Sequence, residues 1–157
     1  MATLLKDTSL AQLAEKLQGS LHYDETYKKL YSTDASVYRE APTAVAYPKD
    51  KRDLQILIQF AEENKISLIP RTAGTSLGGQ VVGQGIVVDV SKYFTEILEI
   101  NPEEKWVKVQ PGVIRDDLNR YLQPYGLMFA PETSTSNRAM IGGMVGNNSC
   151  GTYSIVY

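Results

Sequence analysis

Residues 69–80 read Ile69-Pro70-Arg71-Thr72-Ala73-Gly74-Thr75-Ser76-Leu77-Gly78-Gly79-Gln80, a glycine-rich stretch between the apolar runs 66–69 and 86–90. Glycine adopts positive φ easily and lets a ligand lie directly on the main chain. Successive N–H groups exposed in such a turn form a concave nest for an anion, typically a phosphate. Thr72, Thr75 and Ser76 would add short hydroxyl groups. We therefore predict a phosphate-binding loop between two strands.

A second glycine-rich stretch lies downstream and reads Ile141-Gly142-Gly143-Met144-Val145-Gly146-Asn147-Asn148-Ser149-Cys150-Gly151. Of the 12 glycines in the chain, five fall between Gly74 and Gly85 and four between Gly142 and Gly151. Glycines used only for turns would be scattered along the sequence. Their clustering in two loops instead indicates a ligand site.

The composition excludes several classes of protein. The chain has 157 residues, of which 43% are hydrophobic, so it can form about one domain with a real core. The net charge is −2 and no long basic run is present, so we expect no nucleic-acid partner. Cys150 is the only cysteine, which leaves no intramolecular disulfide and fits a reducing compartment.

The first residues of the chain lack the apolar segment of a signal peptide, and no apolar run is long enough to span a membrane. We therefore expect a cytoplasmic protein without a transmembrane segment. Peripheral association of the full-length protein with a membrane is the alternative.

The hydrophobic patterns predict helices and strands that alternate along the chain. The predicted helices cover residues 10–17, with Thr8 or Ser9 as cap, 51–63, with Asp50 as cap, and 114–122. The predicted strands cover residues 44–47, 66–69, 86–90, 96–100, 105–110 and 127–129. Residues 44–69 thus read as a β–α–β unit. The tyrosine-rich residues 20–41 are interpreted as irregular, so residues 1–41 form a helical and irregular extension and residues 42–157 the main domain.

Two common nucleotide-binding motifs do not fit. A P-loop needs Gly-Lys-Ser/Thr after its glycines, whereas Gly79-Gln80 ends the first stretch without a lysine. A Rossmann fingerprint opens a helix, but the residues after Gly79 lead into a strand. The sequence therefore favours a different dinucleotide site, in which two facing backbone loops hold the ligand. Arg71 is the cation nearest to the first loop and could neutralise part of a pyrophosphate.

Four segments, in the same order along residues 41–151, are similar to the PCMH-type FAD-binding domain of the FAD-linked oxidases, which have the vanillyl-alcohol-oxidase-like fold. They are Ala41-Pro42-Thr43-Ala44-Val45-Ala46-Tyr47-Pro48, residues 70–80, Val109-Gln110-Pro111-Gly112-Val113 with Asp117-Leu118-Asn119, and Pro131-Glu132-Thr133-Ser134-Thr135-Ser136-Asn137-Arg138-Ala139-Met140 continuing to Gly151. The resemblance implies an α+β domain, incomplete at its C-terminal end, with FAD as cofactor.

The resemblance also implies which residues contact FAD. The expected cofactor-binding residues are Pro70, Arg71, Thr72, Ala73, Gly74, Thr75, Ser76, Gly79, Gln80, Pro131, Thr133, Ser134, Ser136, Asn137, Gly142, Gly143, Asn147, Asn148, Ser149 and Cys150. No metal ligands are expected. Some relatives attach the flavin covalently through a histidine, but the only histidine, His22, lies outside both stretches. We therefore expect non-covalent FAD and a structural or solvated His22.

Within that family, residues 31–38 and 136–139 most resemble the branch that oxidises D-lactate, glycolate or D-2-hydroxyglutarate. The resemblance implies hydride transfer from a small 2-hydroxy acid to FAD and then to an electron acceptor. It places the substrate domain and catalytic residues after Tyr157, so the chain alone is expected to be inactive. Some members of this branch are fused to an iron–sulfur half.

Two other classes of function remain open. The same fold could serve a sugar-acid or lactone oxidase, or a transferase that uses FAD without net redox chemistry. The chain could also be a non-catalytic nucleotide-binding module.

Four other side chains are expected to be structural. Cys150 reads as a small packed residue, Trp106 as core or cap packing, and Asp116-Asp117 as favourable charge at a helix N-terminus.

Overall fold

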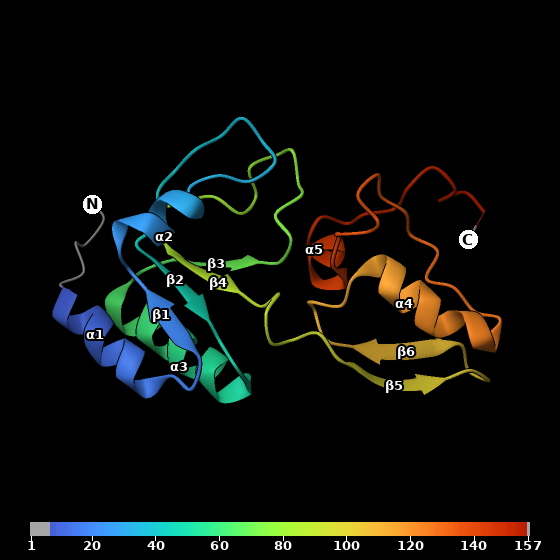
Figure 1. The fold of residues 1–157 in the computed structure, drawn as a ribbon, viewed down its shortest axis with the longest axis horizontal. Coiled ribbons are helices and arrows are strands. Elements are labelled where there is room, and N and C mark those ends of the chain that lie inside the picture. Colours follow the sequence, from blue (N-terminus) through green and yellow to red (C-terminus); the bar gives the residue numbers. More distant parts are fainter. Residues whose placement is uncertain (1–6, 157) are drawn as a thin grey trace.

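The computed structural model describes residues 7–156, and Figure 1 shows that they form two lobes joined by the segment between strands β4 and β5. The first lobe contains α1 (Asp7–Lys16), β1 (Ser20–His22), α2 (Glu25–Leu30), β2 (Ala44–Tyr47), α3 (Lys51–Asn64), β3 (Leu68–Arg71) and β4 (Ile86–Asp89). The second contains β5 (Ile97–Asn101), β6 (Trp106–Val109), α4 (Arg115–Leu122), the 3₁₀ helix η1 (Gln123–Tyr125) and α5 (Ile141–Gly146). Helices combined with a mixed four-stranded sheet and an antiparallel two-stranded sheet confirm the predicted α+β class.

The first lobe is built on a four-stranded sheet in the order β1-β2-β4-β3. β1 pairs antiparallel with β2, whereas β2 and β3 both pair parallel with β4. The predicted β–α–β unit is therefore present as β2, α3 and β3, but β4 lies between its two strands. β3 ends two residues later than predicted and includes Pro70, which an edge strand tolerates because its outer N–H positions need no partner.

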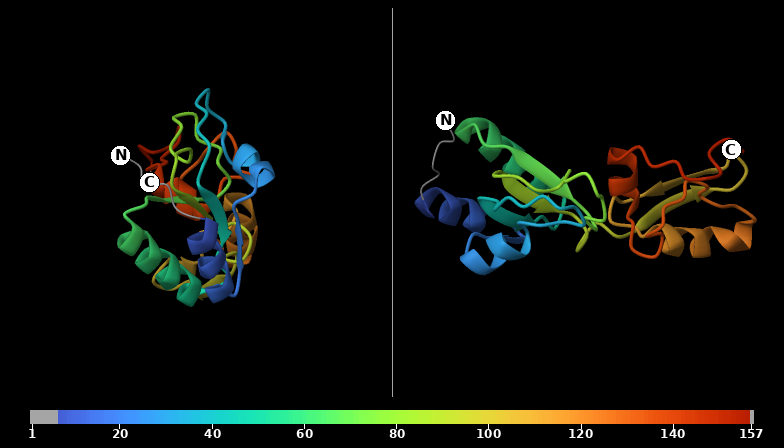
Figure 2. Two further views of the ribbon diagram at one scale, coloured as in Figure 1. Left: turned by 90° about the vertical axis from the view of Figure 1, so that its left-hand side faces the viewer. Right: turned by 90° about the horizontal axis from the view of Figure 1, so that it is seen from above.

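The two faces of this sheet are covered differently, because successive side chains of a strand point to opposite faces. Ala44 and Ala46 of β2, with Ile86 and Val88 of β4, pack against α1 and α3 in one core cluster. Figure 2 shows these two helices on the same side of the sheet. The alternate residues Val45 and Val87 are also fully buried, on the face that α2 approaches.

The predicted helix boundaries in this lobe are partly right. α3 begins after Asp50, whose Oδ1 accepts the N–H of Asp53 at 3.0 Å, as a capping residue does. α1 begins at Asp7, so the predicted caps Thr8 and Ser9 lie inside the helix. The prediction of irregular structure is wrong for residues 20–30, where β1 and α2 form.

Asp53 does more than add charge to the first turn of α3. Its side chain is fully buried. The Asp53 carboxylate accepts the N–H groups of Gln18 at 2.9 Å and of Gly19 and Lys49 at 2.8 Å. Burial raises the pKa of this carboxyl, but the three hydrogen bonds outweigh it and the net pKa is lowered. Asp53 thus joins the ends of α1 and β2 to α3.

The second lobe is smaller and packs α4 and α5 on the β5–β6 hairpin. Its core cluster contains Val113, Leu118, Leu122, Ala139, Ile141 and Met144. Residues 127–129 do not form the predicted strand, and the second glycine-rich stretch starts as helix α5. Trp106 is 39% exposed and donates its indole N–H to Glu104, so of the two predicted roles, core or cap packing, the core role is wrong. Among the described residues, no helix has both the length and the apolarity to cross a membrane.

Candidate functional site

The first glycine-rich stretch follows β3 as an irregular loop. Gly74 and Gly79 have φ of +63° and +71°, in the region that side chains rarely adopt. Within residues 7–156, the N–H groups of residues 73–76 donate no hydrogen bond, so they are available to an anion. A run of available donors is what the predicted phosphate-binding loop requires.

Arg71 lies differently from the expectation that it would neutralise a pyrophosphate. Its Nη1 donates a 2.9 Å hydrogen bond to the carbonyl oxygen of Thr33, and its Cζ lies 4.9 Å from the ring centroid of Tyr31. A Cβ added to Gly74 would lie 2.8 Å from Nη2. The guanidinium is therefore held between Tyr31 and the turn of the loop.

A polar cluster fixes Tyr31 in turn. Its hydroxyl donates to Oδ2 of the buried Asp89 at 2.6 Å and lies 2.6 Å from the hydroxyl of Tyr47. Oδ1 of Asp89 accepts the N–H of Ser91 at 2.8 Å. Burial, together with the hydrogen bond to Asp89, raises the pKa of Tyr31 above its usual value. The hydroxyl therefore stays protonated and keeps donating at ordinary pH.

The second stretch combines α5 with a tight turn. Asn148 and Gly151 have positive φ, and the N–H of Glu132 donates to the carbonyl of Cys150 at 3.1 Å. Thr133 has a buried hydroxyl oxygen without a hydrogen-bond partner in the described chain. A buried hydroxyl without a partner is costly, so this atom marks a place where a ligand group would fit. Cys150 is exposed, contrary to the prediction that it is packed.

The structure brings the two stretches together. Nε2 of Gln80 donates to Oδ1 of Asn147 at 2.8 Å, and Ser76 donates its hydroxyl to the other end of the Gln80 amide. Gly143 lies so close to Thr72 that an added Cβ would be 2.4 Å from its hydroxyl oxygen. Residues 70–80 and 141–151 therefore form one composite surface, as the prediction of two facing loops requires.

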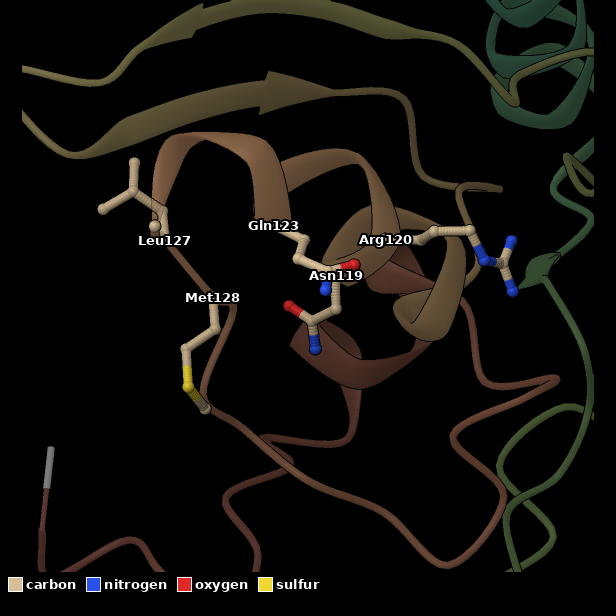
Figure 3. Close-up of a pocket in the computed structure, with 6 residues that line it drawn as sticks. Asn119, Arg120, Gln123, Leu127 and Met128 are labelled. Carbon is tan, nitrogen blue, oxygen red and sulfur yellow. The ribbon is translucent and has the colours of Figure 1, made fainter.

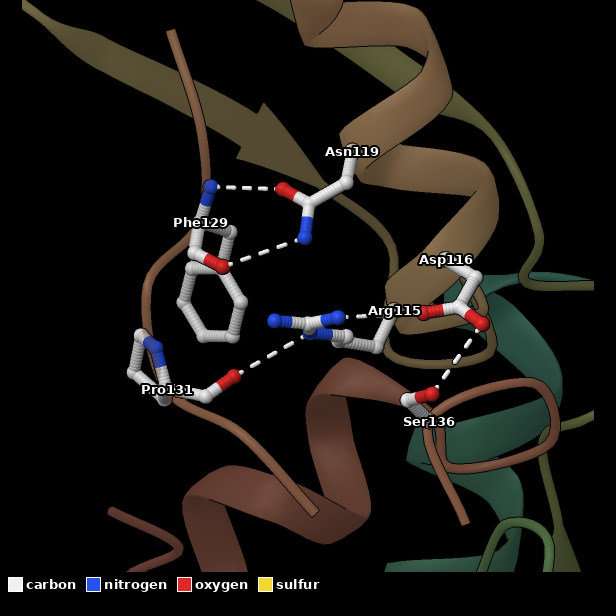
Figure 4. A network of polar contacts seen from close by, with 6 residues as sticks. All are labelled: Arg115, Asp116, Asn119, Phe129, Pro131 and Ser136. Carbon is white, nitrogen blue, oxygen red and sulfur yellow. Dashed lines mark hydrogen bonds and ion pairs between the residues drawn. The ribbon is translucent and has the colours of Figure 1, made fainter. Parts of the chain in front are cut away.

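Helix α4 holds the segment that leads into the second stretch (Figure 4). The Asn119 side chain accepts the N–H of Phe129 at 2.7 Å and donates to its carbonyl at 3.2 Å. Arg115 Nε donates to the Pro131 carbonyl at 3.2 Å, and Ser136 donates its hydroxyl to Asp116 at 3.1 Å. Asp116, predicted only as helix-terminal charge, thus fixes a predicted FAD-contacting residue. Nothing in the sequence indicated that the Asn119 side chain would bond the main chain of Phe129, ten positions away.

We expect Asn119→Ala to loosen residues 129–139. The variant loses two hydrogen bonds to Phe129, each of which contributes about 0.5–1.5 kcal/mol. Amide hydrogen exchange in these residues should therefore become about tenfold faster. Arg120→Ala, one position along α4, is the control, because the Arg120 side chain is 73% exposed and its side-chain hydrogen bond within residues 7–156 is to the exposed Asp117. Equal exchange rates in the two variants would contradict the role of α4 in holding residues 129–139 in place.

Other features lie outside this surface. His22 stacks on Tyr27 with ring centroids 3.8 Å apart, which agrees with a structural role. No group of potential metal ligands is found in the described part of the chain. Figure 3 shows an open pocket beside the end of α4, lined by Asn119, Arg120, Gln123, Gly126, Leu127 and Met128. The pocket contains none of the predicted cofactor-binding residues, so we place the candidate site on the two glycine-rich stretches.

Comparisons with known proteins identify the family of this chain. A family model for the FAD binding domain matches residues 42–157. The chain is 47% identical over 129 residues to D-2-hydroxyglutarate dehydrogenase of Escherichia coli (strain K12). The matched segment covers 80% of this chain and 13% of that protein. It is 32% identical over 146 residues to glycolate oxidase subunit GlcD of Bacillus subtilis (strain 168), covering 90% of this chain and 31% of the relative.

Solved structures show the same fold. An alkyldihydroxyacetonephosphate synthase superposes with a TM-score of 0.83 over 98% of this chain and 31% of its own, at 16% identity. At that identity the likeness concerns the fold alone, and it confirms the PCMH-type architecture that the resemblance implied. This chain spans only 13% of the length of the E. coli relative.

Proposed function

Because this chain belongs to the family of FAD binding domains, we propose that it forms the FAD-binding part of a larger flavin-dependent oxidoreductase. The enzyme would oxidise a 2-hydroxy acid by hydride transfer to non-covalent FAD. The observation that carries the proposal is the contact between two glycine-rich stretches, made by Gln80 and Asn147. D-2-Hydroxyglutarate is the first substrate candidate, since the relatives named for it reach 47% identity and those named for glycolate 32%.

The described residues fit FAD in three ways. The N–H groups of residues 73–76 are available to the pyrophosphate, and Gly74 supplies the positive φ that this turn of the loop needs. Thr133 offers a buried hydroxyl that still needs a hydrogen-bond partner. The residues that we propose to hold FAD are the twenty cofactor-binding residues predicted from the sequence. Arg71 would contribute through the shape of the loop.

In this proposal the flavin supplies the redox chemistry, because the ring of bound FAD accepts the hydride of the substrate. The loops bind the dinucleotide and orient it, while α4 holds the second stretch in register. Groups that bind the acid and take up its hydroxyl proton would lie outside residues 7–156. The proposal includes an electron acceptor that reoxidises the flavin, and it keeps the cytoplasmic location expected from the sequence.

A dye-reduction assay on the complete protein tests the proposed reaction. D-2-Hydroxyglutarate, D-lactate and glycolate would each be supplied in turn, with an L-2-hydroxy acid as a control for stereochemistry. We expect turnover of D-2-hydroxyglutarate that depends on FAD content. A protein with a full complement of bound flavin that oxidises none of the three acids would overturn the substrate class and favour the lactone-oxidase or transferase alternative. A protein that never binds flavin would favour the non-catalytic module.

We expect the flavin to be bound without a covalent bond. His22 is the only histidine in the sequence, and its Nε2 lies 3.0 Å from the Ser20 hydroxyl on β1, outside the glycine-rich stretches. Acid precipitation of the purified protein should therefore release essentially all yellow colour into the supernatant. Flavin that stays in the washed pellet would contradict this, and mass spectrometry of its peptides would identify the attachment residue.

A further inference from the structure

The position of Arg71 follows from the register of the sheet. Arg71 of β3 pairs with Asp89 of β4, at the carboxyl ends of two parallel strands. Ala46 pairs with Val88, so Tyr47 and Asp89 come next in register on neighbouring strands. The side chains of Arg71, Asp89 and Tyr47 therefore lie side by side on adjacent strands. The Tyr31 hydroxyl contacts Asp89 and Tyr47, and the Tyr31 ring lies against the Arg71 guanidinium.

These contacts link the loop to a segment far away in sequence. The N–H of Ala35 donates to the Gly74 carbonyl at 3.1 Å, and Arg71 holds the Thr33 carbonyl two residues earlier. Further along, a Cβ on Gly79 would lie 2.6 Å from the Tyr38 ring. Figure 1 shows the segment before β2 and the loop after β3 side by side at the top of the first lobe.

In this arrangement the Arg71 guanidinium contacts groups of the protein itself, the Tyr31 ring and the Thr33 carbonyl. A guanidinium is planar, so it can stack on an aromatic ring and donate hydrogen bonds along its edge at the same time. A lysine ammonium carries the same charge but lacks the planar fork that can lie over the Tyr31 ring while donating to the Thr33 carbonyl. The Tyr31 side chain is fixed for this contact, because its hydroxyl is hydrogen-bonded to both Asp89 and Tyr47.

We propose that Arg71 and Tyr31 are positioning residues that hold residues 72–79 in the FAD-binding shape by locking them to residues 33–38. The inference rests on the proposed function for its ligand, FAD. A loop that is already shaped loses less conformational freedom on binding, which strengthens affinity without any new contact to the ligand. Arg71 thereby shapes the pyrophosphate site through contacts with the protein and not with the ligand.

Hydrogen exchange in the FAD-free complete protein tests the lock without its ligand. Arg71→Met and Tyr31→Leu should each raise the exchange rate of the Ala35 amide, because the contacts beside its hydrogen bond to Gly74 are lost. Arg120→Met is the matched control, since Arg120 is an exposed arginine in the other lobe. Unchanged Ala35 exchange in both variants would overturn the lock, whether or not the protein binds FAD.

A double-mutant cycle on the dissociation constant of FAD gives the second measurement. Arg71→Met and Tyr31→Leu should each weaken binding about tenfold, and the double variant no more than either one, since both remove the same lock. Arg71→Lys should be nearly as weak as Arg71→Met. Full affinity in Arg71→Lys, or additive losses in the double variant, would instead assign Arg71 to direct charge contact with the pyrophosphate. Wild-type protein without FAD affinity would contradict the proposed function and leave the exchange test of the lock intact.

Discussion

Gly74→Val is expected to yield a folded protein that purifies with little or no flavin. Gly74 has φ of +63°, where a β-branched residue is strained by about 1–3 kcal/mol. Its Cβ would also stand 2.8 Å from Nη2 of Arg71. If this strain applies whenever the loop adopts its binding shape, FAD affinity falls roughly 5- to 150-fold. The ratio of flavin absorbance to protein, measured after purification and again after adding FAD, checks the prediction.

Gly146→Ala is the matched control for that experiment. Gly146 belongs to the second glycine-rich stretch, but its φ is not positive and a Cβ there meets no atom within 4 Å. We expect this variant to keep its flavin. Circular dichroism should show that both variants retain their secondary structure. A normal flavin content in folded Gly74→Val would mean that the first stretch does not hold the cofactor.

Asp53→Ala is expected to destabilise the first lobe by about 3–5 kcal/mol, because three N–H groups lose their shared acceptor. The side chain is fully buried, so little water can replace it. Exchange of the β4 amides, which lie at the centre of the same sheet, should become at least about 100-fold faster. Asp117→Ala, at a side chain that is 54% exposed, should leave this rate nearly unchanged.

The pH dependence of Asp53 follows from its lowered pKa. A carboxyl with a lower pKa in the folded state stabilises the fold fully above its unfolded pKa of about 3.9. That stability is lost as the pH falls through the folded pKa. The difference in unfolding free energy between wild type and Asp53→Asn should therefore be constant above about pH 5 and shrink below about pH 4. A difference that grows on acidification would contradict the hydrogen-bonded carboxylate.

Local patterns in the sequence identified much of the first lobe. The short apolar run 44–47 predicted β2, the helical spacing of apolar residues predicted α3, and Asp50 marked the start of that helix, because these signals act over a few residues. The glycines also predicted a loop of unusual backbone, since Gly74 and Gly79 do adopt the conformation that glycine takes most easily. The family resemblance added FAD, which no local pattern could supply.

Side-chain partners could not be predicted in the same way. Asp53 is bonded to residues 34 and 35 positions away, and Gln80 meets Asn147 across 67 positions. The prediction for Asp116 considered only the neighbouring residues in the chain. Its carboxylate accepts the hydroxyl of Ser136, 20 positions away.

The amino-acid sequence was sufficient for the class of fold, the two glycine-rich stretches and the family, because these rest on residue type and short-range order. The tertiary structure alone placed β4 between β2 and β3, and this order set Arg71 beside Asp89 and under Tyr31. A guanidinium near a predicted phosphate loop can face either the ligand or the protein. Which one it faces depends on strand register and on side chains that are distant in sequence, and only the folded chain brings these together.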